Sequence, residues 1–165
     1  MRTLLVMRHA KSDWNAEYGR DHERPLNDRG QRSARLIGRV LADEGVAPQR
    51  VVSSTAVRAR STATLAKEAG DWDAEIVLDD RIYGGGVDTA IDVARSSPDV
   101  DRLMLVGHQP SWSSLVTVLS GEHVDMKTAT VAVITFDIEG WSALASGGGR
   151  IAAVYQPRDH GEVES

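Results

Sequence analysis

Short apolar runs alternate with segments of helical periodicity along most of this 165-residue chain. The first run, residues 4–7, is too short for a helix and is typical of a strand buried on both faces. The order of strand, polar loop and helix then recurs. We expect further strands at residues 51–52, 76–78, 103–106 and 130–136, and helices within residues 25–45, 59–66, 87–94 and 110–119.

This alternation predicts an α/β fold, a three-layer sandwich in which helices flank a mainly parallel central sheet. Only about twenty residues separate Asp79 from the strand before His108, which leaves room for a short helix but not for a large cap subdomain. Residues 141–145 and 151–155 are expected to form a terminal antiparallel pair around a glycine turn. We expect one domain over residues 1–156 and a mobile tail over residues 157–165.

The composition excludes several classes of function. Nineteen basic against 24 acidic residues give a net charge of -5, which disfavours a general nucleic-acid binder. The absence of cysteine excludes disulfides, thiolate zinc sites, iron–sulfur clusters and cysteine nucleophiles. Without a secretory leader or a long apolar segment, no membrane contact is expected, and the cytoplasm is the default location.

Residues suited to phosphate chemistry follow three of the predicted strands. Arg8 and His9 come after the first strand, Arg58 lies just beyond the second, and His108 follows a later strand. Because the carboxyl ends of parallel strands meet at one edge of a sheet, we expect all four side chains in one crevice. Guanidinium groups suit phosphate oxygens, and imidazoles can act as nucleophile and hydrogen-bond donor. The combination predicts phosphoryl transfer.

Neighbouring residues strengthen this local anion site. A helix that begins near Pro110 would direct its amino-terminal dipole at the anion, and Gly107 would allow the backbone to approach closely. Lys11 and Ser12 are candidates to line the pocket, although polar loop residues of this kind are common. Local attraction of this kind would overcome the acidity of the whole chain.

These segments resemble the histidine phosphatase superfamily, whose hallmark is an Arg-His pair at the end of the first strand, here Arg8-His9. Ala10 stands where the family has glycine, and alanine can occupy ordinary backbone conformations. The resemblance implies a phosphoglycerate mutase-like fold. It is distributed along most of the chain, with supporting segments at Arg24-Pro25-Leu26 with Gly30, at Ser53-Ser54 through Arg58-Ala59 and Thr62-Ala63, and at Val106-Gly107-His108-Gln109-Pro110.

The resemblance implies a covalent mechanism. His9 would be the nucleophile that is transiently phosphorylated, Arg8 and Arg58 would clamp the phosphoryl oxygens, and His108 would stabilise the charge of the transition state. For attack, one ring nitrogen of His9 must be unprotonated while a backbone carbonyl holds the hydrogen of the other, which an unperturbed pKa of about 6.5 permits. The chemistry is expected to need no metal and no cofactor.

The general acid and the substrate stay open. Asp13, Glu17 and Asp80 could each protonate a leaving oxygen or be solvated surface charges. The compact architecture and the segment around Tyr83 most resemble the SixA-type phosphohistidine phosphatases, which act on signalling proteins and whose leaving imidazole needs little help from an acid. An open crevice favours a phosphorylated protein over a small phosphate ester. The alternatives are a small-molecule phosphatase and a non-catalytic phosphoanion-binding module in which His9 is misoriented.

The other arginine, tryptophan and histidine residues considered are expected to be structural or to lie at the surface. Arg24 is expected to form a salt bridge near the start of a helix rather than to bind an extended substrate. Trp112 has the helical spacing of a core residue. His22, His123 and His160 lack a comparable sequence context and are expected at the surface, with no metal-binding triad among them. The sequence does not predict the oligomeric state.

Overall fold

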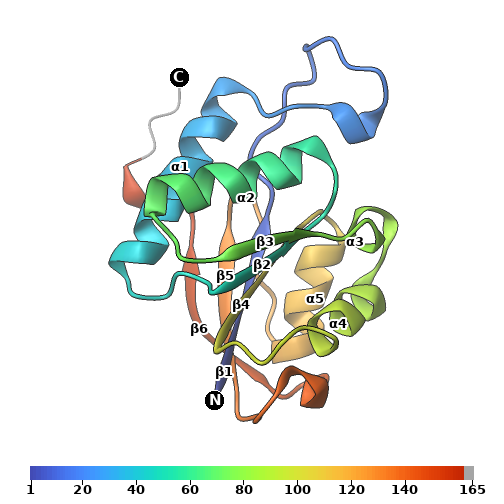
Figure 1. Ribbon diagram of the computed structural model, residues 1–165, viewed down its shortest axis with the longest axis vertical. Helices are drawn as coiled ribbons and strands as arrows, with labels where there is room; N and C mark the ends of the chain where they lie inside the picture. The colour runs from blue at the N-terminus through green and yellow to red at the C-terminus, as the bar shows by residue number, and fades with distance from the viewer. Residues whose placement is uncertain (162–165) are drawn as a thin grey trace.

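A six-stranded sheet with the order β3-β2-β4-β1-β5-β6 forms the centre of the computed structural model, which describes residues 1–161 (Figure 1). The pairs β3–β2, β2–β4 and β4–β1 are parallel, whereas β5 is antiparallel to both β1 and β6. The expectation of a mainly parallel sheet is therefore confirmed. The strands are β1 (Arg2–Arg8), β2 (Arg50–Ser53), β3 (Glu75–Leu78), β4 (Arg102–Gly107), β5 (Val131–Phe136) and β6 (Gly149–Tyr155).

Helices cover both faces of this sheet, which confirms the three-layer sandwich (Figure 1). On one face lie α1 (Asp28–Asp43) and α2 (Val57–Gly70), and on the other lie α4 (Val87–Arg95) and α5 (Ser111–Ser120). Between β3 and β4 there is space only for α4 and the short α3 (Arg81–Gly84), so no large cap covers the sheet. Within residues 1–161, every helix falls short of the length or apolar character that a bilayer span demands.

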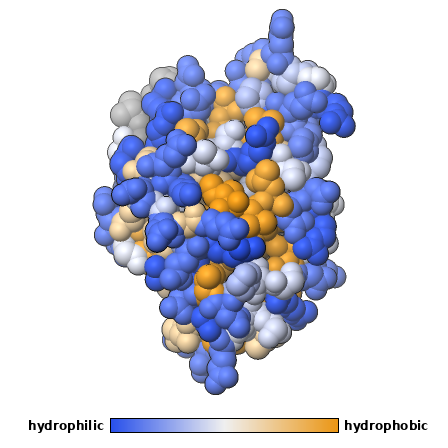
Figure 2. Space-filling view, viewed as in Figure 1, coloured by the Kyte–Doolittle hydropathy of each residue, from blue (hydrophilic) through white to orange (hydrophobic). Residues whose placement is uncertain are grey.

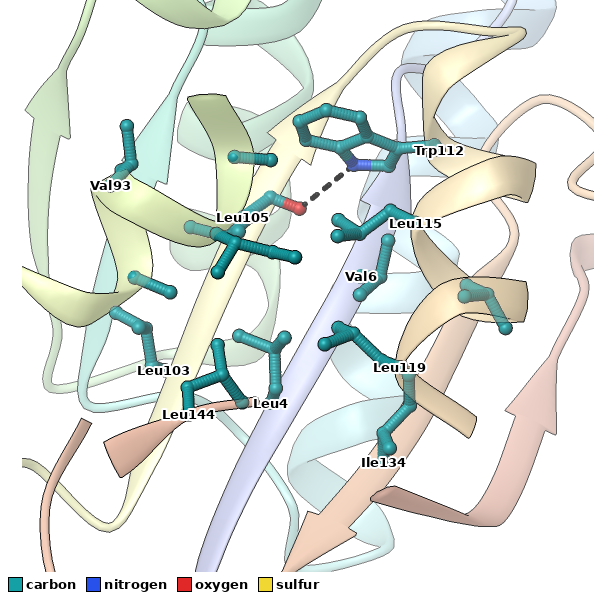
Figure 3. Close-up of a cluster of buried hydrophobic side chains, with 14 of the residues drawn as sticks. Leu4, Val6, Val93, Leu103, Leu105, Trp112, Leu115, Leu119, Ile134 and Leu144 are labelled. Atoms are coloured by element: carbon teal, nitrogen blue, oxygen red, sulfur yellow. Dashed lines mark hydrogen bonds between the residues drawn. The ribbon is translucent and has the colours of Figure 1, made fainter. Parts of the chain in front are cut away.

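The first strand shows why a continuous apolar run forms a strand here. Leu4 and Val6 point into the core beneath α4 and α5, which Figure 3 shows, while Leu5 and Met7 point into the core beneath α1 and α2. All four side chains are fully buried. Because successive strand residues face opposite sides, a strand covered on both faces has no polar face to break the run.

Trp112 on α5 is a core residue, as its spacing predicted. Its side chain is 1% exposed, and its indole Nε1 donates a hydrogen bond of 3.3 Å to the carbonyl oxygen of Leu105 (Figure 3). A Cβ at Gly107 would collide with the indole ring. The glycine before His108 is therefore required by the packing of Trp112, and the expected reason, close approach of the backbone to a ligand, is not needed to explain it.

The predicted strand at residues 141–145 is wrong. Trp141–Ala143 forms a 3-10 helix, and β6 pairs with β5 instead. The Trp141 indole is fully buried, its Nε1 donates to the Val100 carbonyl, and its backbone N–H donates to the Asp99 carboxylate, each at 2.9 Å. These bonds hold the Trp141 side chain in the core and the segment in a 3-10 helix. Its side chains therefore do not alternate between two faces as they would in a strand.

The last described residues lie against α1. Pro157–His160 forms a 3-10 helix in which Pro157 is buried. Residues 162–165 lie outside the described part of the chain, so the mobility of the tail over residues 157–165 and the domain boundary at residue 156 stay predictions.

Candidate active site

The four side chains predicted to converge line one cavity of about 350 Å³ at the carboxyl ends of the parallel strands. Arg8 ends β1 and His9 follows it, Arg58 lies in the first turn of α2, and His108 follows β4. They meet because β2, β4 and β1 are neighbours in the sheet. The rest of the lining consists of Lys11, Ser12, Trp14, Arg24, Gln109 and Thr128, so both predicted pocket residues of the loop after β1 are in place.

The backbone orients the His9 ring, which is 7% exposed. Its Nδ1 lies 2.7 Å from the carbonyl oxygen of Ala10. A carbonyl oxygen only accepts hydrogen bonds, so in the neutral ring Nδ1 carries the hydrogen and Nε2 has a free lone pair. The backbone N–H of His9 donates to Gly107, and that of Ala10 donates to the hydroxyl of Thr62. The loop is thereby fixed between β4 and α2 in the state that nucleophilic attack requires.

Alanine fits at position 10 without strain. Ala10 is fully buried in the core beneath α1 and α2. Among the non-glycine residues of the described part, only Asp71 and Ala129 have a positive φ. The local backbone at position 10 therefore does not need the glycine that is usual in the family.

Both histidines of the cavity are neutral at pH 7. Burial lowers the pKa of His9 to about 3, against the opposing effect of the Ala10 carbonyl and with the help of nearby cationic groups. Burial, followed by the charge of Arg58, lowers the pKa of His108 to about 4. The two ring centroids are 5.2 Å apart. The nucleophile is thus available over a wider pH range than its unperturbed pKa suggests.

These shifts predict how stability depends on pH. In the unfolded chain both histidines take up protons near pH 6.5, whereas in the folded protein they do so only near pH 4 and pH 3. The contribution of these two histidines to the unfolding free energy should therefore be at its maximum above pH 6.5. It should fall as the pH is lowered below that value. Urea unfolding between pH 7 and pH 4.5 measures this slope.

The matched variants are His9→Gln and His123→Gln. The first removes a buried titrating ring, so its slope should be shallower than that of the wild type. The second removes an exposed histidine and should keep the wild-type slope. If His9→Gln and the wild type lose stability in parallel, burial does not disfavour the charged ring of His9.

Several buried nitrogen atoms of the cavity have no hydrogen-bond partner among the described residues. They are Nε of Arg8, Arg24 and Arg58 and Nδ1 of His108. The Ser54 hydroxyl oxygen accepts from the Ala56 N–H and lies 2.8 Å from His108 Nε2, so its hydrogen can go to Nε2 while Nδ1 carries the ring hydrogen. Unpartnered buried donors are costly and rare. Their concentration around His9 fits a cavity that binds anionic oxygens.

Asp21 is a site residue that the sequence did not identify. It lies in a 3-10 helix over Asp21–Glu23, and its carboxylate accepts hydrogen bonds from Arg58 at 2.9 Å, Tyr83 at 2.8 Å and Arg24 at 3.2 Å. Partial burial raises its pKa, but these three donors outweigh that effect and lower the pKa to about 2. Asp21 is therefore ionised at neutral pH. It acts as the counter-ion of Arg58 and cannot serve as a proton donor.

No carboxylate lines the cavity within the described part of the chain. Asp13 uses its side chain to accept from the Asn15 N–H, Glu17 is exposed, and Asp80 lines a separate pocket beside Tyr83. None of the three candidate acids is thus in place beside His9. Nor do residues 1–161 contain a group of three His, Asp or Glu side chains that could hold a metal.

Arg24 has the structural contacts that were expected of it. It is 5% exposed, forms a salt bridge of 3.2 Å with Asp21 and donates to the Ser12 hydroxyl. Its guanidinium lies 3.5 Å from the ring centroid of Trp14, within cation–π distance. Because it also lines the cavity, Arg24 links the loop after β1 to the segment that carries Asp21.

The remaining histidines lie outside the cavity. His123 is exposed, as expected. His22 and His160 are only half-buried rather than fully at the surface. His22 lies 2.8 Å from the Thr55 hydroxyl and edge-on to Tyr83, so it supports the segment around Asp21.

A larger hollow of about 530 Å³ shares no lining residue with this cavity. It lies over α2 and the edge strand β3, where Figure 2 shows apolar atoms gathered near the middle of the face. Leu78 is 49% exposed there, and the described residues that line the hollow include no histidine or carboxylate. This larger hollow therefore lacks the groups that the chemistry needs.

The fold and the cavity agree with comparisons to known proteins. The model of the histidine phosphatase superfamily (branch 1) matches residues 4–84. The structure of a candidate phosphohistidine phosphatase SixA from Nakamurella multipartitia is 31% identical, has a TM-score of 0.80, and covers 94% of this chain and 96% of its own. The chain belongs to the histidine phosphatase superfamily.

Within that superfamily, the protein is SixA-like. A candidate SixA from Agrobacterium tumefaciens is 27% identical, with a TM-score of 0.80 over 94% of this chain and 98% of its own. An uncharacterized protein of Mycobacterium tuberculosis is 34% identical over 92% of this chain and its whole length. These relationships confirm the phosphoglycerate mutase-like fold without a large cap, and they support phosphatase activity.

Proposed function

We propose that the protein removes phosphoryl groups from phosphohistidine side chains of other proteins, through a covalent intermediate on His9. One observation carries the proposal. The unprotonated Nε2 of His9 lies in a cavity with unpartnered donors from Arg8, Arg58 and His108, and no carboxylate of residues 1–161 lines it. The similarity to two candidate phosphohistidine phosphatases of the SixA type supports the same substrate class.

The first step transfers the phosphoryl group to the protein. The lone pair of His9 Nε2 attacks phosphorus while the P–N bond of the substrate breaks, and its electron pair returns to the leaving ring. A ring that solvent has protonated on its other nitrogen departs as neutral imidazole, so the step needs no acid from the protein. Arg8 and Arg58 hold the phosphoryl oxygens, and the Nδ1–H of His108 donates to one of them as charge develops.

The second step restores the enzyme. Water attacks the phosphorus bound to His9, the P–N bond breaks, and the electron pair returns to Nε2. Orthophosphate leaves, and the proton of the water passes to phosphate or solvent. The Ala10 carbonyl keeps the hydrogen on Nδ1 throughout, so the ring returns to the tautomer with which it began.

Leaving-group dependence tests the substrate class. An alkyl ester such as phosphoserine needs a proton on its leaving oxygen, and general acids contribute about 100- to 10,000-fold to such steps. We therefore expect kcat/KM for a protein phosphorylated on histidine to exceed that for the same protein phosphorylated on serine by at least about 100-fold. Release of orthophosphate from the two substrates, measured side by side, gives this ratio.

An aryl phosphate ester serves as the control, because its good leaving group needs no acid. It should be hydrolysed, with a higher KM than the phosphoprotein. If alkyl phosphates react as fast as phosphohistidine, the proposed substrate class is wrong and a small-ester phosphatase takes its place.

A further inference from the structure

A second, smaller cavity lies on the other side of the turn at residues 127–130. We call it the Lys127 pocket. Its volume is about 130 Å³, and of its lining residues only Thr128 also lines the active-site cavity. None of the other lining residues has a part in the proposed reaction. The pocket is lined by Lys127, Thr128 and Thr130 together with Arg29, Gln156, Pro157 and Arg158.

The charge of the Lys127 pocket is opposite to that of the whole chain. Lys127, Arg29 and Arg158 line it, whereas no Asp or Glu among residues 1–161 does, although the net charge of the protein is -5. Within residues 1–161, the side chains of Lys127 and Arg158 have no hydrogen bond or salt bridge. Arg29 already has an interaction, so the argument rests on the other two. Two uncommitted cations over a concave surface attract an anion.

A buried hydroxyl adds a second, independent indication. Thr130 is fully buried, its Oγ1 has no hydrogen-bond partner, and the residue lines this pocket. Buried polar atoms in folded proteins nearly always have a partner, so an unpartnered one calls for an explanation. A hydroxyl donor beside two cations suits an oxyanion. A volume of about 130 Å³ is enough for a tetrahedral oxyanion, since a water molecule takes up roughly 30 Å³.

The turn also connects this pocket to the catalytic residues. The backbone N–H of Ala129 donates to the carbonyl of His9, and the N–H of Arg8 donates to the carbonyl of Thr130, each at 3.1 Å. Ala129 holds a left-handed conformation with a φ of 59°. A ligand that contacts Lys127 and Thr130 therefore contacts the turn on which the backbone of Arg8 and His9 rests.

We propose that the Lys127 pocket is a second anion site, which binds a free phosphate-like oxyanion. It is separate from the cavity that receives the phosphoryl group of the substrate. Because both sites share Thr128 and the turn that supports His9, orthophosphate bound here affects the affinity of the active site. The inference is independent of the substrate proposed above, since none of the residues that carry it takes part in catalysis.

Orthophosphate titration of the full-length protein tests this site. Backbone amide signals in NMR spectra report each site separately, with Thr62 and Arg58 for the active-site cavity and Gln156 and Arg158 for the Lys127 pocket. We expect two saturating processes in the wild type. In Lys127→Met/Arg158→Met the process at Gln156 should weaken by at least about tenfold, because two charge-assisted bonds are lost, while the process at Arg58 remains.

Two further variants separate the site from general effects. Arg35→Met/Arg39→Met removes two exposed charges of α1 outside the pocket and should leave both processes in place. Thr130→Val removes only the hydroxyl and should weaken the second process severalfold without lowering the Tm. A single binding process in the wild type, or equal weakening in both double variants, would overturn the proposal.

Discussion

Replacing His9 with glutamine should abolish turnover. The variant loses the only ring nitrogen in the described cavity that combines a free lone pair with a fixed orientation, because Nδ1 of His9 is bound to Ala10 and His108 is bonded to Ser54. Loss of a covalent nucleophile costs on the order of 10⁴- to 10⁶-fold in rate. We expect kcat/KM for phosphohistidine protein to fall by at least about 10⁴-fold.

The intermediate itself gives the sharper measurement. Rapid quenching with a ³²P-labelled phosphohistidine protein should trap phosphate on the wild type that is labile in acid and stable in base, and none on His9→Gln. His123→Gln is the control, and its turnover and trapped phosphate should equal those of the wild type. Labelled phosphate on His9→Gln would assign the nucleophile elsewhere, and tight binding without turnover in the wild type would favour a phosphoanion-binding module.

The second large effect is expected at Arg58. This residue is 6% exposed, its Nε has no partner, and its Nη1 and Nη2 are held by Asp21. Removal of one preorganised donor to a developing charge typically costs about 100- to 1000-fold in kcat. We expect Arg58→Ala to lose this much activity in steady-state assays while it still folds, as circular dichroism would show.

Arg60→Ala is the matched control for Arg58→Ala. Arg60 is also on α2, but it is exposed and lines the apolar hollow. Its loss removes the same charge without touching the cavity, so kcat should change by less than about twofold, as is typical of surface substitutions. A similar loss of activity in both variants would mean that α2 acts through its overall charge, and would remove Arg58 from the mechanism.

Asp21→Asn should act in the opposite direction to Arg58→Ala on anion binding. The Asp21 carboxylate competes with a phosphoryl group for the guanidinium of Arg58, and the asparagine removes that negative charge. At the effective dielectric of a partly exposed site, such a charge contributes on the order of 1 kcal/mol, which corresponds to about fivefold in affinity. The inhibition constant of orthophosphate should fall by about this factor, and a rise would show that Asp21 mainly positions Arg58.

Hydrophobic patterning was a good guide to the sheet and failed at one place. Strand β1 is predictable because burial on both faces leaves a continuous apolar run, and the helical spacing of Trp112 marks the face of α5 that packs on the sheet. Residues 141–145 are also mostly apolar, but Trp141 is held by Asp99 and Val100. Those partners lie about forty residues away in the chain, so a local sequence pattern cannot predict these contacts.

The candidate site likewise contains residues that the sequence predicted and one that it did not. Arg8, His9, Arg58 and His108 could be placed together in advance, because each lies at the carboxyl end of a parallel strand or within a few residues of it. Asp21 could not, since nothing near it in the sequence distinguishes it from Asp13 or Glu17. Its role comes from Arg58 and Tyr83, which are 37 and 62 residues away.

The sequence by itself determined the chain order of the six sheet strands and of the four longer helices, the family motifs and the residue types available for phosphoryl transfer, because these depend on local spacing and composition. Only the tertiary structure decided which nitrogen of His9 is free, how far burial lowers the pKa of both imidazoles, and which hydroxyl groups and guanidinium Nε atoms lack partners. Protonation and hydrogen bonding depend on solvent exclusion and on atoms brought together from distant segments. A linear pattern of residues does not contain that information.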